Sequence, residues 1–156
     1  DDTLGGEIKE LKRMKKAAYI VPALSLLVSS TLYGCGLDRD MAIDYYNSSK
    51  SELEAAVAEI LENQSADGIA LDGIQSISYW DGDNAIIEFE VYASGIAPAT
   101  TYGGIYYSVS GEPAGFQNTD VTLVETADGW EWQADGGNCG ETTHIEGNWY
   151  TYEAKF

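Results

Sequence analysis

The spacing of apolar residues changes near Gly73 from a helical to an alternating pattern, and this change restricts the possible folds more than any other feature. Before it, apolar residues recur on one helical face, at Leu53, Val57, Ile60 and Leu61. Ser49, with Glu52 three residues later, forms a capping box, which is typical of a helix N-terminus. The sequence therefore predicts a helix over residues 49–63.

The sequence after Gly73 predicts antiparallel strands. Ile87, Phe89 and Val91 alternate with charged or polar residues, as in a sheet with one buried face. Turn-forming residues separate the expected strands, which are residues 74–80, 85–93, 101–109, 121–126, 130–134 and 148–156. This pattern predicts an α+β domain in which one helix packs on a five- to six-stranded antiparallel sheet. The order of elements is similar to that of cystatin-like domains, a likeness that implies no function.

Residues 14–35, MKKAAYIVPALSLLVSSTLYGC, have the composition of an export signal. Lys15 and Lys16 precede an apolar stretch that is too short to span a bilayer comfortably, and a small residue precedes Cys35. Because a removable segment is not required for the core, we expect a helix over residues 14–32 with few contacts to the domain. An ordinary signal peptide cut elsewhere and a buried core helix are the alternatives.

The end of this segment, Leu32-Tyr33-Gly34-Cys35, resembles the lipobox of bacterial lipoproteins. The resemblance implies that Cys35 receives a diacylglyceryl thioether and becomes the first residue of the mature protein. It also implies a membrane partner, because the acylated domain stays anchored on the extracytoplasmic side of a bacterial membrane. Tyr33 departs from the small residue that is usual at its position.

These signals divide the chain into four parts. They are an upstream extension, a lipoprotein signal peptide, a tether and a single α+β domain, at residues 1–13, 14–34, 35–47 and 48–156. An alternative for the tether is that it joins the following helix through Met41, Ile43 and Tyr45. Either arrangement leaves one folded domain after Cys35.

The charge balance of the chain restricts its partners. The formal net charge is −18 at pH 7, and only Arg39, Lys50 and Lys155 are basic after Cys35. Nucleic-acid binding depends on Lys and Arg contacts to phosphates, so we expect no DNA or RNA partner. Disordered acidic chains lack aromatic residues, whereas this chain has four Trp and eleven Tyr. A folded domain with a solvated acidic surface is expected.

The sequence contains no recognisable catalytic, metal or cofactor motif, and we predict none of the three. Asp81, Asp83 and Asn84 have the spacing that begins a calcium loop, but Ile86 and Tyr92 stand where Gly and Glu are required. A hairpin turn at residues 81–84 is the preferred interpretation.

The cysteine and histidine content offers little further chemistry. If Cys35 is acylated, Cys139 has no disulfide partner, and no Lys or Arg stands near it to activate the thiol. His144 is the only histidine, five residues after Cys139 in a Gly-rich segment. A catalytic pair would need a fixed geometry that such a segment does not provide. We predict an unactivated cysteine in a loop or at an edge.

Aromatic residues are more numerous than one thin core layer obviously needs. Core packing and cross-strand ladders account for such residues in many sheets. Aromatic rings also stack on sugars and are enriched at protein interfaces. We therefore expect any ligand face, for a glycan or a protein, on the sheet side away from the helix, built from Tyr102, Tyr106, Trp130, Trp132, Trp149 and Tyr150.

Three functions are compatible with these features. The first is a non-catalytic binding or accessory role for an acidic lipoprotein domain at the cell surface. The second is a small extracytoplasmic hydrolase that uses carboxylates, for which Glu131 between Trp130 and Trp132 is the best candidate acid. On a strand, however, Glu131 faces away from both Trp residues. The third is a structural subunit of an envelope complex.

Overall fold

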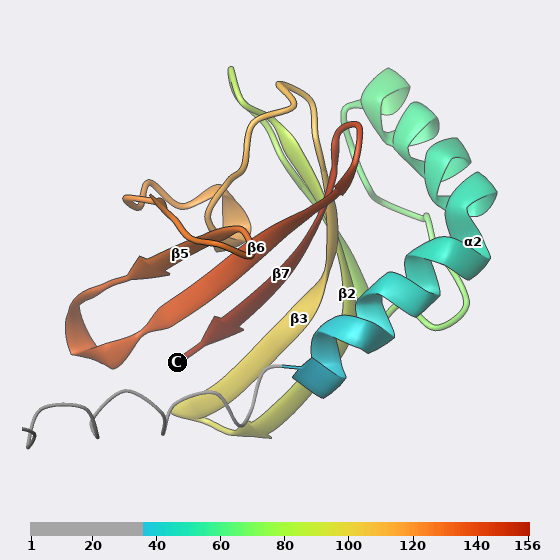
Figure 1. Cartoon of the computed structure of the whole chain (residues 1–156). Helices are drawn as coiled ribbons and strands as arrows, with labels where there is room; N and C mark the ends of the chain where they lie inside the picture. Colours follow the sequence, from blue (N-terminus) through green and yellow to red (C-terminus); the bar gives the residue numbers. More distant parts are fainter. Residues whose placement is uncertain (1–35) are drawn as a thin grey trace, which may run out of the picture. The chain divides into compact units, whose positions relative to one another are not determined.

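The computed structural model describes residues 36–156, which form one helix packed on a seven-stranded antiparallel sheet (Figure 1). The predictions for Cys35 and for a helix over residues 14–32 lie outside the described residues. In chain order the strands are β1 (Ser76–Trp80), β2 (Ile86–Ile96), β3 (Ala99–Ser108), β4 (Val124–Glu125), β5 (Trp130–Gln133), β6 (Cys139–Glu146) and β7 (Trp149–Lys155). Their order across the sheet is β1-β2-β3-β7-β6-β5-β4. The predicted α+β class is confirmed.

The helix, α2 (Gly36–Asn63), is longer than the predicted one. Residues 36–47, expected as a tether, form its first half, and Ala42 and Tyr46 on that half are almost fully buried. Ser49, the predicted helix start, has non-helical φ and ψ of −120° and 16°, so it marks a kink between two helical parts. The predicted helix start at Ser49 is therefore wrong, and burial of Ala42 and Tyr46 stabilises the helix on the N-terminal side of Ser49. No helix within residues 36–156 is long and apolar enough to cross a bilayer.

One face of the sheet forms the main core with α2. Tyr46 of the helix packs against Trp149 of β7, with ring centroids 5.4 Å apart, and Phe89 of β2 contacts the same indole. Ile87 and Phe89 are fully buried on this face, as the alternation in β2 predicts, but the expectation of a half-buried strand is wrong because Ile86 and Glu88 on the other face are buried as well. The apolar helix positions also face this core, at Leu53, Val57 and Ile60.

The additional strand, β6, covers residues to which the sequence assigned no strand and where Cys139 was expected in a loop or at an edge. It pairs with β5 on one side and with β7 on the other, and its Thr142 is buried. The Thr142 hydroxyl donates to the Thr151 carbonyl at 2.8 Å and hydrogen-bonds the Tyr106 hydroxyl at the same distance. The polar, Gly-containing sequence of β6 has no strand-like pattern. The strand forms because of its pairing with partners that are distant in the sequence.

The second face of the sheet carries a smaller core of aromatic residues. Tyr106 and Tyr150 stack with ring planes 11° apart and centroids 5.1 Å apart. The connection between β3 and β4, residues 109–123, passes over this face and contains the short helix η1 (Phe116–Asn118). Phe116 packs against Tyr102 and Tyr152, at centroid distances of 5.6 and 5.5 Å. Both faces of the central strands are therefore covered.

Candidate functional site

The six aromatic residues predicted to form an exposed ligand face do not form one. Trp149 lies on the helix side of the sheet, and Tyr106, Trp132 and Tyr150 are buried. Tyr102 and Trp130 keep part of their surface exposed. The expectation of an exposed aromatic row is wrong because the 109–123 connection covers the second face. Periodicity within strands does not reveal where a long loop packs.

A buried carboxylate under this connection is the most perturbed acid on the second face. Glu88 of β2 is 5% exposed. Its Oε2 accepts a hydrogen bond from the Trp80 indole N–H at 2.9 Å, and its Oε1 accepts one from the Gln117 backbone N–H at 2.6 Å. Gln117 has a φ of 55°, which is uncommon for a residue other than Gly. The bond from Gln117 ties the loop to the sheet in this conformation.

Burial controls the protonation of Glu88. Desolvation raises its pKa from 4.5 to about 7, while the hydrogen bonds from Gln117 and Trp80 act in the opposite direction. The sequence analysis placed Glu88 on the exposed face of its strand. No periodic signal reveals this burial, because Glu88 alternates with Ile87 and Phe89 as a solvent-facing residue would.

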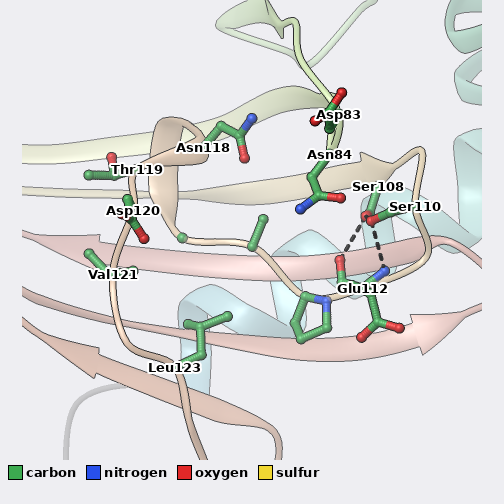
Figure 2. Close-up of a pocket in the computed structure, with 13 residues that line it drawn as sticks. Asp83, Asn84, Ser108, Ser110, Glu112, Asn118, Thr119, Asp120, Val121 and Leu123 are labelled. Atoms are coloured by element: carbon green, nitrogen blue, oxygen red, sulfur yellow. Dashed lines mark hydrogen bonds between the residues drawn. The ribbon is translucent and has the colours of Figure 1, made fainter.

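A polar cavity of about 360 Å³ opens between the same connection and one end of the sheet (Figure 2). Figure 2 shows Asp83 and Asn84 from the β1–β2 turn facing the 109–123 connection across this space. The Ser108 hydroxyl donates to the Glu112 carbonyl at 2.7 Å and fixes one wall. Four further lining residues offer side-chain oxygen or amide groups, at Ser110, Asn118, Thr119 and Asp120. The cavity can exchange hydrogen bonds with a hydroxyl-rich or amide-containing ligand.

The candidate metal ligands are not brought together. Among residues 36–156, no three His, Cys, Asp or Glu side chains lie close enough to hold a metal ion. The β1–β2 turn with Asp81 and Asp83 and the β5–β6 connection with Asp135 lie at opposite ends of the sheet. Asp83 instead shares the polar cavity with Glu112 and Asp120.

Cys139 and His144 both belong to β6 but do not meet. Their separation of five residues places them on opposite faces of the strand. The exposed His144 ring contacts Tyr150, and its Nε2 lies 2.9 Å from the Gly147 carbonyl oxygen. Cys139 is half-buried at the opposite end of β6 and pairs with Lys155 of β7. This geometry does not provide a nucleophile with an adjacent base.

Comparison of this chain with protein-family models, curated proteins and solved structures finds no significant match.

Proposed function

We propose that this chain is a lipid-anchored extracytoplasmic domain of a bacterial membrane, attached through Cys35, with a non-catalytic binding or accessory role. One observation carries the proposal beyond the lipobox resemblance. The described residues that follow Cys35 form a folded domain of one helix and seven strands, and Ala42 and Tyr46 near the beginning of this domain are buried. A domain of this kind can remain folded after a signal segment is removed at Cys35.

The state of Glu88 supports a binding role over hydrolysis. A catalytic acid must come within hydrogen-bond reach of the reacting group. Glu88 has a raised pKa, but both of its oxygens accept bonds from the protein and it does not line the polar cavity. Glu131 is exposed on β5, where Trp132 points to the opposite face and is buried. Neither residue has the surroundings that carboxylate hydrolysis requires.

Lipidation can be tested by metabolic labelling with an alkyne fatty acid in a bacterial host. We expect the wild-type protein to incorporate the label and Cys35→Ala to lose it completely, because the thioether forms only at that sulfur. Cys139→Ala is the matched control and should be labelled like the wild type. Label in Cys35→Ala, or an unlabelled wild type, would contradict the proposal.

The polar cavity is the surface that we assign to binding. It involves the β1–β2 turn, whereas α2 starts at the other end of the sheet, so an anchored domain would present the cavity away from the membrane (Figure 1). On a glycan array, we expect Asn84→Ala to weaken binding by up to about tenfold, the effect of losing one or two hydrogen bonds. Asp128→Ala, in the exposed β4–β5 turn, is the control. Equal binding by both variants would remove the cavity from the proposal.

A further inference from the structure

The start of α2 and the turn between β2 and β3 lie at the same end of the domain (Figure 1). Lys155 of β7 pairs with Thr101 of β3 at this end. The positive charges of Arg39, in the first turns of α2, and of Lys155 both act on the half-buried Glu141, and both oppose the rise in its pKa that burial causes. The beginning of the helix therefore lies close to the strands that lead into the β2–β3 turn.

The tip of this hairpin is apolar and exposed. Ile96 is 86% exposed, although large aliphatic side chains are usually buried. Ala97, Pro98 and Ala99 beside it are also exposed. Phe156 is hydrogen-bonded to Thr100 through both of its backbone groups and is 42% exposed. An apolar surface of this kind indicates an interaction site.

The charge pattern separates this hairpin from the rest of the acidic surface. Residues 91–111 contain no charged side chain, in a chain with a net charge of −18. By contrast, the β1–β2, β4–β5 and β5–β6 connections each contain an Asp. Arg39 and Lys155 lie at the hairpin end together with the acidic residues Asp40, Glu141 and Glu153, and Lys155 is ion-paired with Glu153 at 2.6 Å. The uncharged tip beyond these residues therefore suits an apolar surface.

We propose that the β2–β3 hairpin tip, residues 95–99, inserts into the surface of the phospholipid bilayer that holds the Cys35 lipid. The inference rests on the proposed lipidation. Because Gly36 follows Cys35 directly and already belongs to α2, the anchor leaves little freedom between the bilayer and this end of the domain. The apolar tip gains free energy when it leaves water. Asp135 in the β5–β6 connection lies at the same end, and only β7 stands between the two hairpins, so insertion requires the domain to tilt with the β2–β3 tip towards the bilayer.

A fluorescent label at the tip tests the insertion. Full-length protein is produced in bacteria, purified with its lipid and reconstituted in vesicles of phosphatidylcholine and phosphatidylglycerol. In a Cys139→Ser background, Ala99→Cys carries an environment-sensitive fluorophore, and Ala127→Cys in the β4–β5 turn is the matched control. We expect the label at position 99 to shift its emission to shorter wavelength and to be quenched by brominated lipids. The label at position 127 should show neither effect.

A second substitution separates insertion of the hairpin from insertion of the label. Adding Ile96→Asp to Ala99→Cys should abolish the emission shift and the quenching while the circular dichroism spectrum is unchanged. If the vesicle-bound, lipidated protein keeps the position 99 label in water, the hairpin proposal is wrong and the anchor proposal stands. If mass spectrometry finds no lipid on the protein, both proposals are wrong. Persistence of the shift in the Ile96→Asp variant would also overturn the hairpin proposal.

Discussion

The free energy of unfolding is expected to fall by about 3 kcal/mol between pH 4.5 and about pH 7 through the ionisation of Glu88 alone. Burial raises the pKa of Glu88 in the folded protein, so in this range the folded state keeps a proton that the unfolded chain has lost. Raising the pH then favours unfolding. The stabilisation is complete below the ordinary pKa of 4.5 and is lost as the pH passes the folded value of about 7.

Urea denaturation over this pH range measures the effect. Glu88→Gln should flatten the decline, because an amide does not titrate, whereas Glu131→Gln on the exposed face of β5 should leave it unchanged. Glu146 acts in the opposite sense, since bonds from Lys50 and Tyr46 lower its pKa and favour the folded state as the pH rises from acid. A decline in Glu88→Gln as steep as in the wild type would show that another group is responsible.

Replacing Gly104 by Ala is expected to destabilise the protein by about 3 kcal/mol or more. A Cβ atom at position 104 would overlap the carbonyl oxygen of Phe89 on the neighbouring strand and crowd the Val91 amide nitrogen at 3.0 Å. These are backbone atoms beside the irregularity between Glu90 and Tyr92, where the pairing of β2 with β3 shifts register. Overpacking commonly costs about 1–3 kcal/mol, and here no side-chain rotation can relieve it.

The neighbouring glycine provides a matched comparison. A Cβ atom at Gly103 would meet the ring of Tyr92, a side chain that can rotate away at the expense of its 2.9 Å hydrogen bond to Glu153. We expect Gly103→Ala to cost about 1–3 kcal/mol, because a buried carboxylate then loses a donor. Urea denaturation of both variants measures which substitution lowers the free energy of unfolding more. A smaller loss for Gly104→Ala than for Gly103→Ala would contradict the account of the clash.

The proposed lipid anchor and the proposed contact of the hairpin with the bilayer lie at the same end of the domain. The lipid would hold the protein at the bilayer, and the uncharged hairpin would orient it there. The polar cavity would then face away from the membrane. The acidic residues elsewhere would keep the anchored domain apart from anionic lipid surfaces, in agreement with a contact restricted to one end.

The sequence by itself determined the fold class and the packing of one sheet face. The periods of the Leu53–Leu61 and Ile87–Val91 segments predict a helix and a one-sided strand, because residues of like polarity recur on one side of each element. These features depend on interactions between residues that are close in the chain.

Only the tertiary structure decided what covers the second face. The 109–123 connection folds over that face, covers Glu88 and two of the aromatic residues expected to be exposed, Tyr106 and Tyr150, and lines the polar cavity. Strand β6 likewise depends on pairing with β5 and β7. The physical reason is that the burial of Glu88 and the pairing of β6 arise from contacts between distant segments. Such contacts leave no periodic pattern in the segments themselves.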